Sequence, residues 1–329
     1  IYVADYNAPL LNATLHCKID YPFTYEIVDG EVTITSCEQS IVGEVVIPAI
    51  IEGYPVTRIG NNAFKDCKQL TSVVLPDSVT AIGDDAFWFC TKLKSVNIPN
   101  GVKTIGGWAF TGCYELTSAL IPASVTSIGH GAFQYCYKLV GFSVDENNSA
   151  YANDEYGVLF DKAKKTLIKA PETHTGSYHI PESVTYIGGS AFQSCEGLTE
   201  ITIPDSVTTI GTYAFFGCFR LQNVRIPTNV TYIGSSAFDG CTSITEMVLP
   251  EQITKINSLT FGQCGNLKSI TIPENVTMVE NYAFQDCTAL QDVYYGGTKA
   301  QWEAIVKEDG WDNRTGIYVV HCTDGDITK

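Results

Sequence analysis

The chain has 329 residues, 45% of them hydrophobic and 17% charged, so it can bury a substantial core and is not expected to be disordered. Its formal net charge of −16 disfavours nucleic acids and anionic membrane surfaces as partners, because both repel a negative protein. It has no uninterrupted apolar run of about 18 residues, so we expect no membrane insertion of this chain.

Residues 1–45 are predicted to form a linker followed by a capping hairpin. The alternating segments Tyr25–Val28 and Val32–Thr35 flank Asp29-Gly30, which is a strong signal for a two-residue hairpin turn. We expect this hairpin to cover the open edge of a sheet, because an uncovered edge templates aggregation.

Residues 46–144 and 180–295 contain an internal repeat with a spacing of 23 residues. An apolar-Pro pair, an Ala-Phe pair and a cysteine recur in the same phase, and nine copies in phase do not arise by chance. We expect these two segments to form front and back coils of leucine-rich repeats. The cysteines of the repeat are Cys67, Cys90, Cys113, Cys136, Cys195, Cys218, Cys241, Cys264 and Cys287.

The first half of the repeat predicts a strand. One copy opens with Leu70-x-x-Val73-x-Leu75, which is the pattern of leucine-rich repeats. Val73 and Leu75 alternate with outward positions, as in a strand with one buried face. Pro76 ends the strand, because proline cannot donate a hydrogen bond to a sheet.

The second half of the repeat is predicted to turn back into the core. Gly83 is expected to supply a flexible corner. The stretch Asp84–Cys90 is short and places Ala86 and Phe87 inward at helical spacing, so it predicts one helical or 3₁₀ turn. A single repeat cannot fold alone, so the coils must stack and share their buried faces.

The regular spacing breaks once, in an irregular insertion at residues 145–179. Val158–Phe160 and Thr166–Ile168 are joined by a lysine-rich turn and predict a hairpin there. The acidic stretch Asp145–Asn148 would offer ligands to a cation. It lacks the spacing of a calcium loop, so a solvated loop is the favoured interpretation and no metal is predicted.

Residues 296–329 are predicted to form a C-terminal cap helix and a tail. Thr298 opens a capping-box pattern, and a helix from about Lys299 to Lys307 would place Trp302 over the last coil. After this helix we expect a short strand from Ile317 to Val320.

The repeat cysteines are predicted to be free thiols. In a stack they form one buried file with neighbours about 4.7–4.9 Å apart, whereas a disulfide needs Cβ atoms about 3.8 Å apart. We expect these thiols to act as small hydrophobic side chains. Cys17 and Cys37 lie outside the file and could pair with each other, and Cys322 has no evident mate.

No motif for catalysis, cofactor binding or metal binding is visible. The sequence lacks His-Glu-x-x-His, Gly-x-Ser-x-Gly, the phosphate-binding loop and the dinucleotide fingerprint. A carboxylate pair suited to glycoside hydrolysis could still assemble in space. A protein without enzymatic activity, cofactor or metal is the favoured interpretation, and a sugar-active enzyme is the weakest alternative.

Two surfaces are candidates for ligand binding. The outward strand positions form a small, mostly uncharged face that includes Asn97, Arg225 and Tyr294. The second candidate is a set of aromatic residues in the variable columns of the turns: Trp88, Phe89, Trp108, Tyr114, Tyr135 and Tyr137. Exposed aromatic residues are favoured at interfaces and on sugar-binding surfaces. The alternatives are a strand face that is merely soluble and aromatic rings that pack against one another between coils.

The repeat Ile-Pro-x-x-Val-Thr-x-Ile-Gly-x-x-Ala-Phe-x-x-Cys resembles the BspA-like leucine-rich repeats of bacterial surface proteins, from about Ile41 to Tyr295. The resemblance implies a right-handed, curved leucine-rich-repeat solenoid with a parallel β-sheet on one face. With the short helical turns expected on the other face, the fold class is an α/β repeat. The resemblance also implies adhesion to host or extracellular-matrix proteins.

We therefore expect an adhesin-like bacterial protein, secreted or displayed at the cell surface, that binds an extracellular protein or glycan without catalysis. The alternative is a structural spacer, meaning a rigid repeat segment of a larger surface protein with no ligand of its own. Periodicity predicts a fold and not a ligand, so the sequence leaves both interpretations open.

Overall fold

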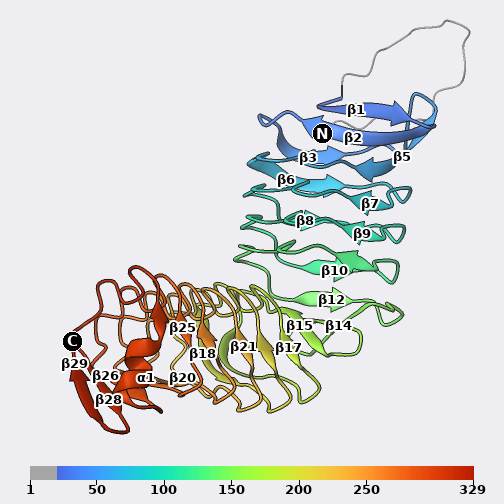
Figure 1. The fold of residues 1–329 in the computed structure, drawn as a ribbon. Coiled ribbons are helices and arrows are strands. Elements are labelled where there is room, and N and C mark those ends of the chain that lie inside the picture. The colour runs from blue at the N-terminus through green and yellow to red at the C-terminus, as the bar shows by residue number, and fades with distance from the viewer. Residues whose placement is uncertain (1–20) are drawn as a thin grey trace, which may run out of the picture. The chain divides into compact units, whose positions relative to one another are not determined.

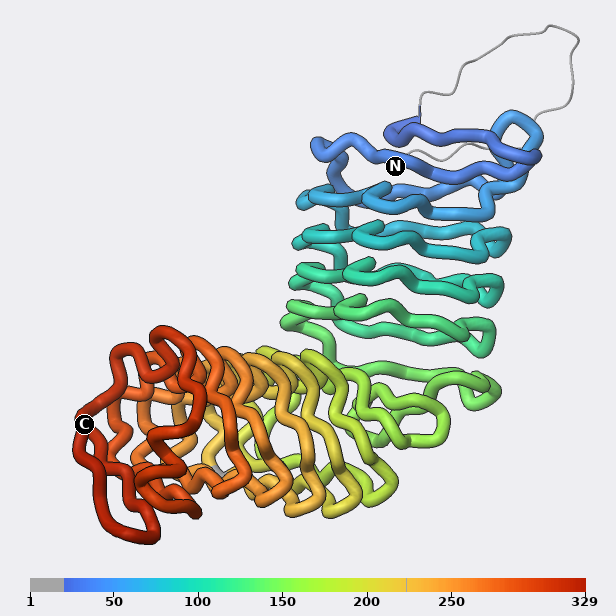
Figure 2. The backbone as a smooth tube through the Cα atoms, in the orientation of Figure 1, coloured from blue at the N-terminus to red at the C-terminus, as the bar shows by residue number. Residues whose placement is uncertain are grey.

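The computed structural model describes residues 21–329, which form a solenoid of about 13 turns with parallel sheets. Contacts divide the chain into two compact units. The front unit contains the described residues up to Glu115 together with Ser127–Phe133, and the back unit contains Leu116–Thr126 and Gln134–Lys329. Figure 1 shows the coils stacked within each unit, and Figure 2 traces their backbone. The division of the sequence into five segments stays a prediction.

Each coil has a first strand where the Leu-x-x-Val-x-Leu pattern predicts one. In β6 (Gln69–Val74), Leu70 and Val73 are buried while Val74 is exposed, so one face of the strand faces the core. Parallel pairing of such strands forms the first row of the solenoid. In the front unit this row is β3 (Val42–Val46), β6 and β8 (Ser95–Val96). In the back unit it is β10 (Ala119–Ile121) and β12 (Phe142–Val144), then β16 (Thr175–His179), β18 (Gly197–Thr202) and β20 (Asn223–Val224), then β22 (Glu246–Val248), β24 (Ser269–Ile272), β26 (Asp292–Tyr295) and β28 (Val319–Cys322).

The Thr-x-Ile part of the repeat forms a second row of strands, which the sequence does not predict. In the front unit this row is β1 (Phe23–Val28), β2 (Glu31–Cys37), β5 (Tyr54–Ile59), β7 (Ala81–Ile82), β9 (Thr104–Ile105) and β11 (Ser127–Ile128), with β4 (Ile50–Ile51) beside β5. In the back unit it is β13 (Tyr151–Asn153), β14 (Leu159–Asp161), β15 (Thr166–Lys169), β17 (Tyr186–Ile187), β19 (Thr209–Ile210) and β21 (Tyr232–Ile233), then β23 (Lys255–Ile256), β25 (Met278–Val279) and β27 (Val306–Lys307). The coils therefore carry sheets on two sides, and the expectation of a single sheet face is wrong.

The third side of the coil, which we call the turn side, is not helical, so the expected helical turns are wrong. Within residues 21–329 the one α-helix is α1 (Lys299–Ala304). Two positions per coil have positive φ angles, such as Asp85 (53°) and Phe89 (54°), and a right-handed helix accommodates neither. The N–H of Phe87 donates to the oxygen of Ala109 in the next coil at 2.7 Å. The Ala-Phe pair does face inward, but on tight turns that are bonded to the neighbouring coils.

The glycine after the second strand allows close approach of adjacent coils. A Cβ atom on Gly83 would lie 2.6 Å from the backbone nitrogen of Asn61, and one on Gly129 would lie 2.3 Å from that of Gly107. Real Cβ atoms essentially never show contacts under 3.0 Å, so a side chain at either position would require the adjacent backbone to shift. The last two copies of the repeat carry Asn257 and Glu280 in this column, so glycine is the residue of most coils and not of all. Gly83 has no positive φ angle, and the flexible corner expected there is wrong.

The core is a stack of phenylalanine rings beside the cysteine file. In the front unit, the buried rings of Phe64, Phe87 and Phe110 are nearly parallel, with successive centroids 5.0 and 5.2 Å apart. The Cys90 thiol donates to the oxygen of Phe64 at 3.0 Å, and the Cys113 thiol donates to that of Phe87 at 3.3 Å. All nine repeat cysteines are buried thiols that form no disulfide bond, as predicted. The thiol therefore satisfies a carbonyl of the preceding coil as well as filling space.

Cys37 does not lie outside the file, which corrects the prediction. β2 places it beside Cys67, and the interaction with that thiol is the main reason that the pKa of Cys37 is raised. The Cys37 thiol also donates to the oxygen of Pro22 at 3.2 Å. Cys37 and Cys322 are free thiols, and Cys17 lies outside the described residues.

The two predicted hairpins are confirmed. β1 and β2 pair antiparallel around Asp29 (φ 51°) and Gly30 (φ 79°), which suits a type I′ turn, and β2 pairs in parallel with β5. The N-terminal hairpin therefore covers the end of the second row. In the insertion, β14 and β15 pair antiparallel, and β15 continues into the second row of the back unit by pairing with β17.

The C-terminal cap differs from its prediction beyond the start of the helix. Thr298 forms the expected capping box, but α1 ends at Ala304 instead of Lys307. The next residues form β27, and the expected strand begins at Val319 and pairs antiparallel with β29 (Gly325–Thr328) instead of leading into a tail. Both β27 and β28 pair with strands of the last coil. Pairing with an open sheet edge outweighs a longer helix here.

Replacing Gly211 by alanine should destabilise the back unit by roughly 1–3 kcal/mol. The added Cβ would lie 2.6 Å from the backbone nitrogen of Gly189. The matched control is Gly265→Ala, because its Cβ would meet nothing closer than the Thr288 hydroxyl at 3.9 Å. Chemical denaturation measures both variants, and equal stabilities would contradict the spacing role of the glycine column.

Candidate functional site

Three of the predicted aromatic residues form a packed cluster on the turn side of the front unit. The rings of Trp88 and Phe89 have centroids 4.2 Å apart, and Phe89 meets Tyr114 edge to face at 5.8 Å. The ammonium group of Lys65 lies 4.5 Å from the centroid of Trp88. All three rings are half-buried, so each presents only part of its surface to a ligand.

Trp108 is the most open aromatic residue of the front unit, with 45% of its surface exposed. Its ring meets His130 edge to face at 5.9 Å. Asp85 and Gly131 occupy the same position in the adjacent coils, and neither carries a large side chain that would cover the indole. Trp108 is therefore an exposed aromatic surface beside a packed aromatic cluster.

Phe89 and Trp108 have positive φ angles of 54° and 52°. This left-handed region costs a residue other than glycine about 1–2 kcal/mol, and bulky side chains are rare in it. The same two positions carry Asn62, Asp66 and Asp85 in neighbouring coils, and these small polar residues tolerate the region better. The fold therefore does not require an aromatic residue at either place.

Tyr135 and Tyr137 belong to the back unit and not to the unit of the other four aromatic residues. Their ring centroids are 6.1 Å apart. The hydroxyl of Tyr135 accepts a hydrogen bond from the Gln193 amide at 2.8 Å, whereas Tyr137 is 47% exposed. The single aromatic set predicted from the sequence is thus divided between the two units.

Two of the predicted strand-face residues already have partners within the protein. The Asn97 side chain accepts from the N–H of Leu75 at 2.8 Å and donates to its oxygen at 3.0 Å, so the amide takes the place of strand pairing. Arg225 is exposed and forms an ion pair with Asp205 at 3.3 Å. Asn97 has a structural role, and Arg225 is held by an exposed pair that is easily broken.

Tyr294, the third strand-face residue, is exposed and stacks on His321 with centroids 4.9 Å apart. The two ring nitrogens of His321 bind Asp292 at 2.9 Å and Asp326 at 3.0 Å. These hydrogen bonds raise the pKa of His321 above its ordinary value. The arrangement fixes the Tyr294 ring in place at the C-terminal end of the first row.

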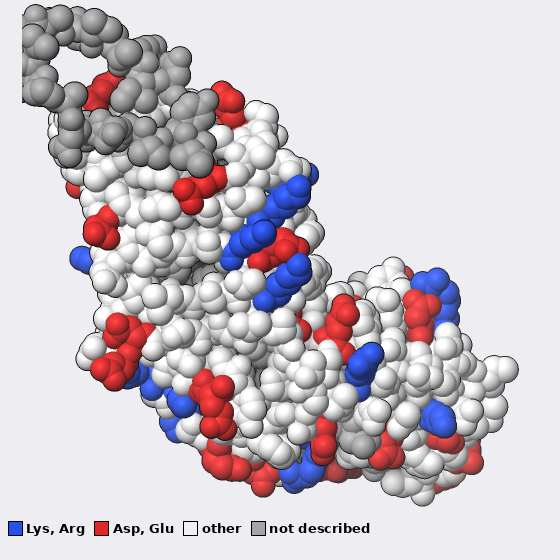
Figure 3. Space-filling model, turned by 180° about the vertical axis from the view of Figure 1, so that it is seen from behind, with Lys and Arg blue, Asp and Glu red and all other residues white. Residues whose placement is uncertain are grey.

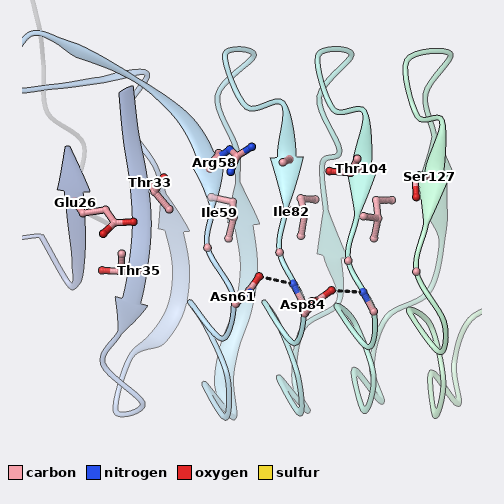
Figure 4. Close-up of a pocket in the computed structure, with 17 residues that line it drawn as sticks. Glu26, Thr33, Thr35, Arg58, Ile59, Asn61, Ile82, Asp84, Thr104 and Ser127 are labelled. Atoms are coloured by element: carbon pink, nitrogen blue, oxygen red, sulfur yellow. Dashed lines mark hydrogen bonds between the residues drawn. The ribbon is translucent and has the colours of Figure 1, made fainter. Parts of the chain in front are cut away.

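The structure contains a groove of 670 Å³ in the front unit that the sequence analysis missed, and we call it the front groove. It crosses the second row of strands from β1 to β11 (Figure 4). Asn61 and Asp84 line one side, where Asn61 accepts from the N–H of Asp84 at 2.9 Å and Asp84 accepts from that of Gly107 at 2.7 Å. The sequence signal was present in the small outward residues of this row, which the sequence analysis did not consider.

Charged side chains of both signs are interspersed on the face shown in Figure 3, and large areas between them carry no charge. Among residues 21–329, no group of three His, Cys, Asp or Glu side chains is placed to hold a metal ion. No helix in this part of the chain is long and apolar enough to cross a bilayer.

A buried ion pair lies at the insertion in the back unit. Lys169 Nζ is 3.1 Å from Glu172 Oε1, and this oxygen also accepts from the N–H of Tyr135 at 2.8 Å. Burial raises the pKa of Glu172, and the Lys169 ammonium offsets part of that rise. Both side chains are more than nine-tenths buried, so the pair joins elements of the core and does not meet an external substrate.

Replacing Asp239 by asparagine should stabilise the back unit at pH 7.5 and have little effect near pH 4. Burial raises the pKa of Asp239 to about 6, whereas an unfolded aspartate titrates at about 3.9. The folded state binds this proton more tightly, so wild-type stability falls as the pH rises from about 4 to 6. Asparagine has no such loss and can still accept from Gln263, which gives a gain of roughly 1–3 kcal/mol.

Denaturation of both proteins at the two pH values measures this difference. A variant that gains the same stability at pH 4 as at pH 7.5 would rule out titration of Asp239 as the cause.

Comparison with known proteins agrees with this geometry. Residues 53–156 and 172–291 match the family model of the BspA type leucine rich repeat region, in six copies. Among curated proteins, none matches the chain. A solved structure of a leucine rich cell surface protein from Faecalibacterium prausnitzii is 30% identical, with a TM-score of 0.55, and the match covers 91% of this chain and 98% of that one.

Two further solved structures share the fold at lower identity. A leucine-rich repeat protein from Eubacterium ventriosum is 24% identical with a TM-score of 0.68, covering 91% of this chain and 95% of that one. The pneumococcal vaccine antigen PcpA is 20% identical with a TM-score of 0.59, covering 90% and 97%. Because the family model spans most of the repeat array and the Faecalibacterium relative matches nearly end to end, this chain belongs to the BspA-type leucine-rich-repeat family.

Proposed function

We propose that this chain is a non-catalytic, adhesin-like protein, secreted or displayed at the bacterial cell surface, that binds an extracellular protein or glycan. Its location is supported by the Faecalibacterium relative, which is described as a cell surface protein. Its binding role is supported by one observation in the front unit, namely aromatic side chains that point outward from strained backbone positions.

The backbone strain at these positions is what favours a binding role for the aromatic residues. Gly112 and Gly131 occupy the positive-φ positions of other front coils, so the fold is satisfied by glycine there. Phe89 and Trp108 each cost about 1–2 kcal/mol at equivalent positions, and Trp108 also leaves much of its ring in water. Neither aromatic residue therefore improves the stability or the solubility of the protein. Residues that keep such strain cluster at ligand-binding sites, where large aromatic rings supply contact area.

A structural spacer without a ligand gains nothing from this arrangement. Asp or Gly at position 108 would serve a spacer better, because both tolerate a positive φ angle and neither exposes an indole. The aromatic residues therefore favour a binding protein over a spacer.

Replacing Trp108 by glycine should weaken ligand binding at least tenfold without lowering the melting temperature. The change removes the exposed indole and also relieves the strain at φ 52°, so loss of binding cannot be attributed to unfolding. The measurement is binding of the full chain to an array of extracellular-matrix proteins and glycans, followed by titration of each ligand found.

The matched control is Tyr213→Gly. Tyr213 holds the equivalent position in a back coil, with φ 58° and 43% of its surface exposed. The Tyr213→Gly change relieves the same kind of backbone strain but leaves the front unit unchanged. A wild-type chain that binds nothing on the array would favour the spacer, and equal binding by both variants and wild type would exclude the Trp108 surface.

A further inference from the structure

The front groove originates in a row of outward residues that are small except for Arg58. Strand pairing places these residues side by side in register on β2, β5, β7, β9 and β11: Thr33, Arg58, Ala81, Thr104 and Ser127. With strands about 4.8 Å apart, the row is roughly 19 Å long. In the back unit the same position carries larger side chains, including Tyr186, Tyr232, Lys255 and Met278. The front coils leave open a strip that the back coils fill.

Two polar rails border this strip, as Figure 4 shows. Arg58, Thr104 and Ser127 lie along one rail, and Asn61 and Asp84 lie along the other. Between the rails run the glycines of the close-approach column, so the backbone itself forms the floor. Within residues 21–329, no hydrogen bond or ion pair engages the side chains of Arg58, Thr104 or Ser127. These groups are available to donate to and accept from a ligand.

A peptide fits this lining poorly. The central strands under the groove, β2, β5, β7 and β9, already pair on both sides, so a peptide that crosses them gains no sheet hydrogen bonds. Ile59, Ile82 and Ile105 are buried at 1% exposure, and the groove therefore offers no apolar pocket for an anchoring side chain. Nucleic acid fits no better, because Glu26 and Asp84 contribute negative charge to the lining.

We propose that the front groove binds a linear, neutral oligosaccharide that lies along the stack of coils. The rails supply hydroxyl, amide, carboxylate and guanidinium groups, which match the many hydroxyls of a sugar chain. The lining carries one positive group, Arg58, against the carboxylates of Glu26 and Asp84, so an anionic sugar has no net attraction. Trp108 directly follows Gly107 of the lining in the chain, and its indole is exposed on the turn side. A sugar chain that extends past Gly107 toward the turn side would reach an aromatic ring on which it can stack.

This inference rests on the proposed function, because it assumes an extracellular ligand, and it names the chemical class of that ligand. It differs from the proposed function in its site, because the ligand contacts outward residues of the second row of strands and the aromatic surface only adds to that contact.

Filling the groove with a tyrosine at Ala81 tests the inference. The probes are neutral linear hexasaccharides of β-1,4-linked glucose, mannose or xylose, titrated calorimetrically into the full chain. We expect at least one to bind, and we expect Ala81→Tyr to weaken that binding at least tenfold. Tyrosine is native at this row position in β17 and β21, so the fold accepts it. Arg58→Gln, which replaces the guanidinium with a shorter amide without adding bulk, should also weaken binding.

The matched control is Thr209→Tyr, which makes a similar change in the same row of the back unit and should leave binding unchanged. Thermal melting establishes that each variant is folded. Equal binding by wild type and both groove variants would overturn the groove as the site, as would a sulfated hexasaccharide that binds more tightly than every neutral one. If no hexasaccharide binds but a matrix protein binds through Trp108, the groove inference fails while the proposed function stands.

Discussion

Backbone hydrogen bonds hold adjacent coils at strand spacing on all three sides, and every column of side chains has to fit that spacing of about 4.8 Å. The first and second rows achieve it by parallel strands. The turn side achieves it without strands, because alternate N–H groups donate to the next coil, as from Phe192 to Ala214 at 2.7 Å. Glycine occupies most positions where the backbones come closest, with Asn257 and Glu280 as exceptions, and flat aromatic rings suit the core because their stacking distance is similar.

The same constraint separates columns that are fixed from columns that are free. The inward Phe and Cys columns contact the coils on both sides, so a change in one coil affects two neighbours. The outward columns face solvent and can vary without moving the backbone. Variation in the second row leaves the front groove open in one unit and filled in the other. Variation on the turn side places Trp108 where the two adjacent coils have Asp85 and Gly131. Both candidate binding surfaces arise in free columns.

The buried columns could be predicted from the sequence because each recurs many times, and the N-terminal hairpin because Asp29-Gly30 is specific for its turn. The structure of the turn side could not be predicted in this way. Inward residues spaced as in Ala86, Phe87 and Cys90 fit a helix as well as two tight turns. The feature that distinguishes them is the positive φ angle at positions 85 and 89. Because these two residues are Asp85 and Phe89 and not glycines, the sequence of this coil gives no sign of it. The front groove was missed for a related reason, because it results from side chains that are small and not from a recognisable motif.

Strained aromatic residues are compatible with this fold because of how its stability is distributed. A buried phenylalanine contributes about 1.5–3 kcal/mol, and each coil buries one beside several aliphatic side chains. The strain at Phe89 or Trp108, at about 1–2 kcal/mol, is therefore smaller than the contribution of one core residue in the same coil. Since stability in a repeat array is nearly a sum over coils and their interfaces, two strained positions in consecutive coils are offset by the rest of the stack. A short globular domain has fewer such contributions, whereas a solenoid can add ligand contacts coil by coil without changing its core.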